Sequence, residues 1–246
     1  MPAVLFHYTS INNLALILNS KSIRFGRLDK VNDPTEGQSE DFKTLAPYIF
    51  ISCWTENAEE NLPFWNMYTP QMRGVRIELP LPIFNSYKIG QNYNLLVSEE
   101  EYDDNINNFF IFPGKNEPDR IEYTDNIDKL KPKIITEKGL RIRDLALHKR
   151  GIWEIEQEFR YRLDIFPTDP KVQSLNFLDK YDHLIGIQNP SIEGYLISIQ
   201  ENSFNNMKIR LSPKIISGDY EIITALLDKF NPNAVLEKSV LTGLIR

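Results

Sequence analysis

Phe6-His7-Tyr8-Thr9-Ser10 links the two patterns that decide how the fold begins. The apolar run at 3–8 predicts a buried strand. Apolar residues then recur at helical spacing over 11–18, which predicts a helix with one face turned inward. Thr9 or Ser10 can cap that helix, because a hydroxyl here accepts a free backbone N–H of the first turn. A short strand is predicted at 22–25, so the chain opens as strand, helix, strand.

Composition excludes several classes of protein. The chain has 246 residues, of which 41% are hydrophobic and 25% charged, as in ordinary globular proteins. The single cysteine, Cys53, cannot form an internal disulfide, and with three histidines it leaves too few ligands for a Cys/His metal cluster. No stretch approaches the roughly 20 apolar residues that span a membrane, and the first residues do not resemble a signal peptide. We expect a cytoplasmic protein with no metal and no membrane segment.

Charge argues against general nucleic-acid binding. The formal net charge is −6, which lacks the positive footprint of a DNA or RNA binder. Lys and Arg residues are nevertheless mixed along 129–149. They form either a local basic patch or the solvated face of a helix.

The rest of the chain predicts short strands and a few helices. Strands are predicted at 48–54, 74–79, 158–163, 183–187, 195–200, 208–211 and 234–237. Helices are predicted at 39–45, 133–149 and 220–230, with part of 59–68 helical. The two types do not alternate strictly, which favours an α+β fold over a doubly wound parallel sheet. We expect one domain over 1–246, with a variable excursion at about 87–132 that holds strand signals at 93–97 and 120–123.

Two clusters have a structural and a chemical interpretation. His7, at a strand end before a helix, can hydrogen-bond a ligand hydroxyl, or its ring can be satisfied locally. Aromatic side chains near the strand at 48–54 can stack on a flat heteroaromatic ring, or they can pack in the core. Those side chains are Trp54, Phe64, Trp65 and Tyr68.

A third cluster is acidic. In a strand, Glu154, Glu156 and Glu158 would share one face, because alternate residues point the same way. Arg160 and Arg162 would extend that face. The pattern is either a solvent face of alternating charge or a carboxylate cluster that needs a cation nearby. Such carboxylates can stabilise an oxocarbenium-like transition state, as they do in glycosidases.

Together these motifs resemble an uncharacterised bacterial family over essentially the whole chain. The shared pieces are 7–10 (His-Tyr-Thr-Ser), 32–36 (Asn-Asp-Pro-x-Glu), Ser52 with Trp65 and Tyr68, 153–160 (Trp-x-x-Glu-x-Glu-x-Arg) and a closing strand at 239–246. That family in turn resembles a distant branch of the ADP-ribosyltransferase superfamily. There, a strand with His-Gly-Ser/Thr leads into an Asn-Leu/Phe-x-x-Ile-Leu helix. Here, His7-Tyr8-Thr9 leads into Asn13-Leu14 and Ile17-Leu18.

The resemblance implies split β-sheets with flanking helices, and NAD as co-substrate. His7 would hydrogen-bond the adenosine ribose. The backbone of Tyr8, which stands where that branch has glycine, and the hydroxyl of Thr9 would hold the nicotinamide amide. Tyr68 or Trp65 would stack on the nicotinamide ring.

The same resemblance assigns the catalytic carboxylates. Glu158 would contact the nicotinamide ribose and stabilise the oxocarbenium ion, and Glu156 would help to orient the acceptor. Ser52 and Arg160, which belong to the shared motifs, would lie at the same NAD site. The similarity does not decide which of the two glutamates is catalytic.

Three functions stay open on the sequence. The first is an NAD-dependent ADP-ribosyltransferase, as a bacterial toxin or anti-phage defence effector that modifies a protein or nucleic acid and pairs with a cognate antitoxin or partner protein. The second is an NAD glycohydrolase, in which water is the acceptor. The third is a catalytically inactive nucleotide-binding or protein-interaction module.

Overall fold

The N-terminal strand, helix and strand form as the sequence predicts. The computed structural model describes residues 2–89, 93–104, 109–167, 179, 183 and 192–245. It begins with β1 (Val4–Thr9), α1 (Ile11–Ser20) and β2 (Ser22–Arg27). The Ser10 hydroxyl caps α1 by accepting the Asn13 backbone N–H at 3.1 Å. Leu14, Ile17 and Leu18 give the helix its buried face. α1 therefore covers the sheet to which β1 belongs.

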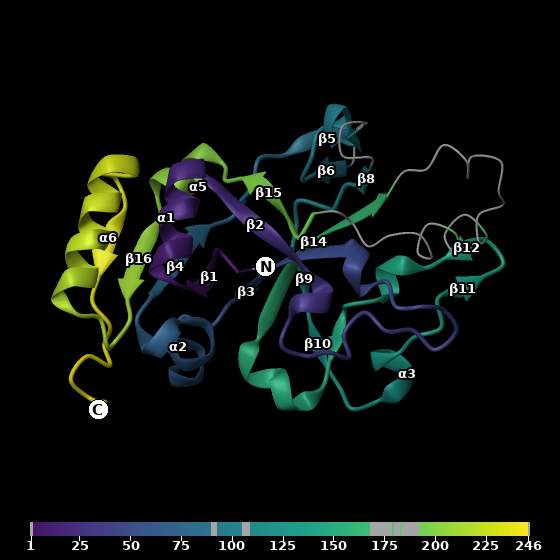
Figure 1. Ribbon diagram of the computed structural model, residues 1–246, viewed down its shortest axis with the longest axis horizontal. Coiled ribbons are helices and arrows are strands. Elements are labelled where there is room, and N and C mark those ends of the chain that lie inside the picture. Colours follow the sequence, from purple (N-terminus) through teal and green to yellow (C-terminus); the bar gives the residue numbers. More distant parts are fainter. Residues whose placement is uncertain are drawn as a thin grey trace.

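One mixed sheet runs through the described chain, so the expected α+β class is confirmed. Eleven of the described strands join it, in the order β17-β16-β4-β1-β3-β14-β8-β7, with β2, β15 and β9 attached beside this path. Figure 1 shows β16, β4 and β1 on one side of β3, and β14, β9 and β8 on the other. The remaining strands of the sheet are β3 (Ile49–Thr55), β4 (Val75–Pro80), β7 (Asp103–Asp104), β8 (Phe109–Phe112), β9 (Asp119–Arg120), β14 (Glu158–Pro167), β15 (Gly194–Ser198), β16 (Lys208–Leu211) and β17 (Val235–Glu237).

The sheet has a narrow junction between β1 and β3. These strands pair at one position, Phe6 opposite Thr55. β1 instead pairs with β4 along its whole length, and β3 pairs with β14 from Glu158 opposite Thr55 to Asp164 opposite Ile49. The sheet therefore consists of two well-paired halves, and β1 and β3 join them through a single paired position. Side chains from both halves can face one space at this junction.

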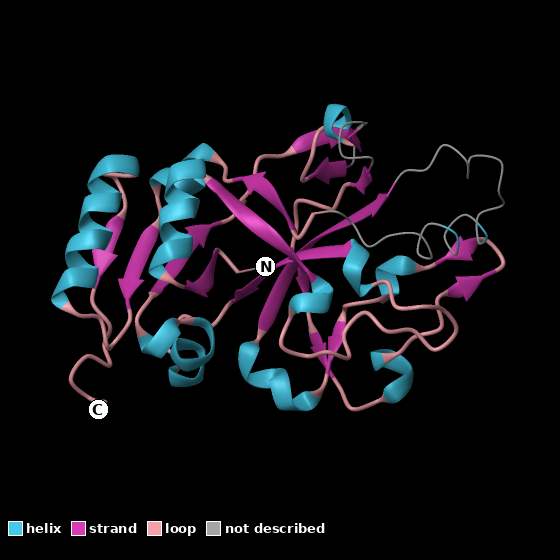
Figure 2. Ribbon diagram, viewed as in Figure 1, coloured by secondary structure: helices cyan, strands magenta, loops and turns pink. Residues whose placement is uncertain are grey.

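Helices flank the first half, and loops dominate around the second. α1 packs beside α6 (Ser217–Phe230) over the first half. Around β10 (Glu122–Tyr123) and β13 (His148–Lys149) the chain is mostly loop (Figure 2). The other described elements are α2 (Leu62–Tyr68), α3 (Ile127–Leu130), α5 (Glu201–Asn205), β5 (Tyr87–Ile89), β6 (Tyr93–Leu95), β11 (Ile135–Thr136), β12 (Gly139–Leu140), and the 3-10 helices η1 (Leu28–Lys30), η2 (Ala46–Tyr48), η3 (Pro70–Met72), η4 (Glu99–Glu101), η5 (Ile142–Asp144) and η6 (Gly151–Glu156). No described helix has the length and hydropathy to cross a bilayer.

The predicted helix at 133–149 is wrong. The segment forms the short hairpin β11–β12, then η5 and β13. Gly139 turns the hairpin with φ of 120°, a conformation that other residues rarely adopt. The carboxylate of Asp41 accepts the backbone N–H groups of Ile134 and Ile135, at 2.9 and 3.1 Å, which fixes the chain before the hairpin. A distant side chain and one glycine thus override the local helical pattern.

Two further predictions are corrected, and one lies largely outside the described chain. Residues 39–45 form turns and extended chain, because the Ser39 hydroxyl closes a local loop with the backbone of Phe42. The closing segment at 239–245 forms turns instead of a strand, since the Ser239 hydroxyl accepts the Leu241 N–H and turns the chain there. Of the strand predicted at 183–187, only His183 is described, and it is helical.

The side chain of Glu60 links α2 to Ser239 and Val240 near the C-terminus. Its side chain is 1% exposed. The carboxylate accepts the indole N–H of Trp65 at 3.1 Å, the Ser239 hydroxyl at 2.5 Å and the Val240 N–H at 2.7 Å. Leu241 then packs on the apolar cluster that Phe64 and Trp65 of α2 form with Tyr8 of β1. One buried carboxylate therefore fixes where α2 lies against β1.

Replacing Glu60 with alanine tests this link. Glu60→Ala leaves three donors without their acceptor, so we expect the free energy of unfolding to fall by about 3 kcal/mol. Urea denaturation measures the change. The neighbouring variant Glu59→Ala is the control, because Glu59 is exposed and its loss should cost no more than about 0.5 kcal/mol. Equal effects of the two variants would contradict the account.

Candidate functional site

A pocket of about 240 Å³ lies where the two halves of the sheet meet. β1 and α2 supply one wall, β3 and β14 supply another, and the loop after η1 and the end of η6 complete it. The lining residues are Phe6, His7, Tyr8, Lys30, Val31, Asn32, Cys53, Trp54, Thr55, Phe64, Tyr68, Lys149, Glu156, Glu158 and Arg160. Residues far apart in the sequence therefore share one cavity.

Most of the residues that the sequence singled out line this pocket. They are His7, Tyr8, Tyr68, Glu156, Glu158 and Arg160. The remaining three lie behind its walls. Thr9 is buried and accepts a hydrogen bond from the Asn13 side chain at 3.1 Å, and Ser52 accepts the indole N–H of Trp54 at 2.9 Å. Trp65 is fully buried against Tyr8. Of the two aromatic residues expected to stack on a ligand, Tyr68 is the one placed to do so.

The acidic cluster does not form along a strand as expected. Glu154 and Glu156 belong to η6, and β14 begins only at Glu158. Gln157 between them has φ of 42°, which breaks the alternation of a strand. Glu154 is exposed. Glu156 and Glu158 nevertheless converge, because both contact the same cation.

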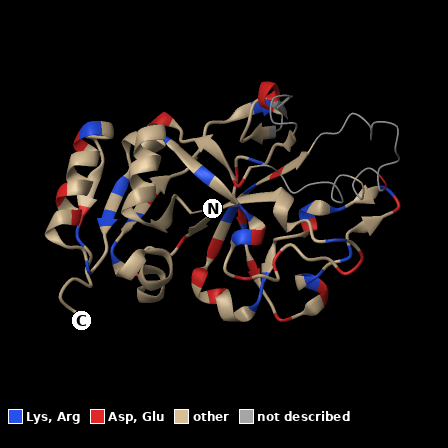
Figure 3. Ribbon diagram, in the orientation of Figure 1, with Lys and Arg blue, Asp and Glu red and all other residues tan. Residues whose placement is uncertain are grey.

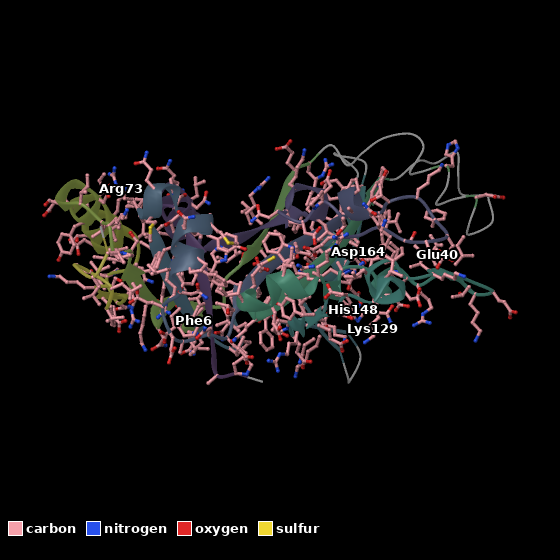
Figure 4. All side chains as sticks on the ribbon, turned by 90° about the horizontal axis from the view of Figure 1, so that it is seen from below. Phe6, Glu40, Arg73, Lys129, His148 and Asp164 are labelled. Atoms are coloured by element: carbon pink, nitrogen blue, oxygen red, sulfur yellow. The ribbon has the colours of Figure 1, made fainter. Side chains whose placement is uncertain are left out.

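That cation is Lys149, from the stretch that was expected to form either a basic patch or a solvated helix face. Lys149 is 6% exposed, so the solvated-face interpretation is wrong for it. Its Nζ lies 2.5 Å from Glu156, 3.1 Å from Glu158 and 3.5 Å from Glu36. The indole ring of Trp153 covers it, with the ring centre 5.0 Å from Nζ. By contrast, Lys129 and His148 lie near each other at the surface (Figure 4), where both contact Glu122.

Arg160 is the second buried cation. Its guanidinium forms a bidentate pair with Glu158, at 2.8 and 2.9 Å, and donates to Glu36 at 2.6 Å. It also donates to the carbonyl of Ala146 at 3.0 Å. The side chains of all three partners in these ion pairs are at most 3% exposed. Figure 3 shows the acidic and basic segments side by side in the middle of the molecule.

Glu36 is a member of the site that the sequence analysis did not list. A turn presents it: the Asp33 carboxylate accepts the backbone N–H and the hydroxyl of Thr35, at 2.9 and 2.6 Å. The signal was the Asn-Asp-Pro-Thr-Glu motif at 32–36, whose purpose becomes visible only with Arg160 and Lys149 in place. Lys149 itself carried no local signal.

The floor of the pocket belongs to a buried ion cluster. Three carboxylates, those of Glu36, Glu156 and Glu158, surround two cations, Lys149 and Arg160. Glu36 lies behind the lining, where its Oε1 is 3.5 Å from Lys149 Nζ. The carboxylates that line the pocket, and can face positive charge on a ligand, are therefore those of Glu156 and Glu158.

The charges set the protonation of the cluster. Burial alone would raise the pKa of Glu158, but Arg160 and then Lys149 outweigh it and lower that pKa to about 2. Burial would lower the pKa of Lys149, yet the surrounding carboxylates, Glu158 first, raise it. Burial and the neighbouring Glu156 raise the pKa of Tyr68 far above its ordinary value. Tyr68 thus stays a neutral donor, whose hydroxyl lies 2.5 Å from Glu156.

His7 is poised as a neutral acceptor. Its Nδ1 lies 2.9 Å from the carbonyl oxygen of Cys53, which can only accept, so Nδ1 carries the proton. Burial lowers the pKa of His7, and the bond to Cys53 offsets this only in part. The ring lies 5.2 Å from that of Trp54, centre to centre. Nε2 is left as an acceptor for a ligand hydroxyl or amide.

Comparisons with protein-family models, curated proteins and solved structures find no match to this chain. In the described ranges, no group of three His, Cys, Asp or Glu side chains is arranged to hold a metal ion. The carboxylates of the pocket are matched by Lys149 and Arg160 instead.

The pH dependence of stability tests the ion cluster. Because the pKa of Glu158 in the folded protein, about 2, lies below the ordinary value of 4.5, its ionised form stabilises the fold above about pH 4.5. That contribution is lost as the pH falls toward 2, and we expect it to amount to roughly 2–3 kcal/mol. Urea denaturation between pH 7 and pH 3 measures it.

Two variants calibrate that measurement. Glu158→Gln should be less stable at pH 7 and should show a smaller loss of stability between pH 5 and pH 3 than the unaltered protein, because Asp33 and Asp219, whose pKa values are also lowered, still contribute. Glu154→Gln is the control, because Glu154 is exposed and lies four residues before Glu158. It should behave as the unaltered protein does. An unchanged pH dependence in Glu158→Gln would show that Glu158 is not held ionised by its neighbours.

Proposed function

We propose that the pocket binds NAD and cleaves it, and that the protein is an ADP-ribosyltransferase. The observation that carries the proposal is the convergence, in one pocket, of a neutral histidine, aromatic walls and a floor with the two buried carboxylates of Glu156 and Glu158. Sheet halves that meet at one contact are compatible with the split sheets that the resemblance implies.

The nicotinamide half of NAD suits this pocket. Its ring is flat and positively charged, so it is attracted to aromatic faces and to the carboxylate floor. Tyr68, Phe64 and Trp54 supply the aromatic walls. About 240 Å³ is less than the roughly 300–1,000 Å³ of pockets for drug-sized ligands, so the adenosine half would extend past the mouth. Lys30, exposed at the pocket, is a suitable partner for the phosphates.

Tyr8 does not obstruct this arrangement. Its ring contacts Phe64 and Trp65 edge to face, at 5.1 and 4.7 Å between centres, and it is 6% exposed. Its hydroxyl accepts the Asn61 N–H at 3.4 Å. The bulk of Tyr8 is thus taken up by the cluster under α2. A tyrosine in place of glycine is compatible with a ligand beside β1.

The reaction needs only charge stabilisation. The bond between the nicotinamide nitrogen and ribose C1′ breaks, and its electron pair leaves with neutral nicotinamide. The ribose becomes an oxocarbenium ion, which the carboxylate floor stabilises in a site with little water. A nucleophile of the acceptor then bonds to C1′ and releases its proton to solvent. With a protein or nucleic acid as acceptor this is ADP-ribosyl transfer, and with water it is hydrolysis.

Nicotinamide release and NAD binding test the proposal. The unaltered protein should release nicotinamide from NAD, and calorimetry should detect binding. His7→Asn keeps a donor for the Cys53 carbonyl but removes Nε2, so we expect NAD to bind about tenfold more weakly, as for the loss of one good hydrogen bond. His148→Asn is the matched control, because His148 pairs with Glu122 outside the pocket.

The outcomes separate the candidate functions. Labelled ADP-ribose on a macromolecule would support the transferase, and free ADP-ribose alone would indicate a glycohydrolase. Binding without cleavage would indicate an inactive nucleotide-binding module. Neither binding nor cleavage, with protein, nucleic acid and water all offered as acceptors, would contradict the proposal.

A further inference from the structure

The two glutamates at the floor of the pocket have different partners. Glu158 accepts two bonds from Arg160 and one from Lys149. Glu156 accepts one bond from the neutral hydroxyl of Tyr68 and one from Lys149. Glu158 is therefore occupied by two cations, whereas Glu156 shares a single one.

This difference decides how much negative charge each carboxylate can offer a ligand. The bidentate guanidinium neutralises Glu158 and occupies both of its oxygens. Lys149 is divided among three carboxylates, at 2.5, 3.1 and 3.5 Å, so it neutralises Glu156 only in part. Of the two carboxylates that line the pocket, Glu156 therefore keeps more of its negative charge available to a ligand.

The backbone supports the same distinction. Glu158 is the first residue of β14 and is fixed by pairing with Thr55 of β3. Its N–H also donates to the Tyr123 hydroxyl at 2.8 Å. Glu156 ends η6, and the left-handed Gln157 separates it from the strand. Glu158 is thus part of the sheet. Glu156 lies outside the sheet, at the end of η6, and its side chain contacts Tyr68 of α2.

We propose that Glu156 is the catalytic carboxylate, the one that contacts the ribose as the nicotinamide leaves. Tyr68 and Lys149 position it, and Glu158 with Arg160 and Glu36 forms the fixed support beneath. This assignment rests on the proposed NAD cleavage. The carboxylate forms no covalent bond and takes no proton in the reaction, and the positive charge that it faces disappears when the acceptor bonds to C1′.

Glutamine variants test the assignment by comparing rate with stability. Glu156→Gln should lower the rate of nicotinamide release by about 100-fold or more, the usual cost of losing a group that stabilises transition-state charge. Glu158→Gln should lower the melting temperature more, because it breaks the bidentate pair. The reverse order, with the larger rate loss in Glu158→Gln at equal folded fraction, would overturn the assignment.

Two tyrosine variants keep the test decisive if Glu158→Gln does not fold. Tyr68→Phe removes a donor to the Glu156 carboxylate, and Tyr123→Phe removes the acceptor of the Glu158 N–H. Tyr68→Phe should lower kcat about tenfold, with little change in the Kd for NAD.

Tyr123→Phe is the control for Tyr68→Phe. It should leave kcat close to that of the unaltered protein, because Tyr123 contacts the backbone of Glu158 and not a carboxylate. A tenfold loss of kcat in Tyr123→Phe without one in Tyr68→Phe would favour Glu158 and overturn the assignment. An unaltered protein that cleaves NAD, with Glu156→Gln equally active, would overturn the assignment alone. An unaltered protein that neither binds nor cleaves NAD would overturn the proposed function, and the assignment with it.

Discussion

The buried guanidinium of Arg160 is the group on which the site depends. It joins the β14 residue Glu158, the turn residue Glu36 and the carbonyl of Ala146. One side chain thus holds the turn at Glu36, 124 positions away, together with the nearer Ala146 and Glu158. A charge buried in this way is tolerated only when it is fully paired, so loss of any partner leaves another charge unmatched. The pocket floor therefore forms as a unit.

From this unit, two contacts extend the constraint across the junction of the sheet. Lys149 brings Glu156 to the cluster, and Glu156 accepts the hydroxyl of Tyr68 on α2. α2 packs on β1 and is fixed to the C-terminal residues through Glu60. The two halves of the sheet, which share one register position, are in this way also joined through side chains that line the pocket. The side chains that join the two halves of the sheet are therefore also those of the candidate site.

Local sequence patterns predicted what local forces decide. The opening strand and helix follow from apolar spacing and the Ser10 cap, and β14 follows from its alternation. The failures have nonlocal causes. The segment at 133–149 is held by Asp41, nearly a hundred positions away, and Lys149 is buried by acids from three segments. The pair of Arg160 with Glu36 spans 124 positions, which periodicity cannot reveal. The shared motifs did indicate seven of the fifteen lining residues, but not their partners.

The central claim is that this pocket holds the nicotinamide half of NAD against Glu156. A crystal structure of Glu156→Gln with NAD tests it most directly, because a slowed variant should keep the dinucleotide intact. The account predicts the nicotinamide ring against Tyr68, a ribose hydroxyl on His7 Nε2, and ribose C1′ beside residue 156. NAD bound elsewhere on the protein, or in this pocket with its ribose on Glu158 and away from residue 156, would contradict it.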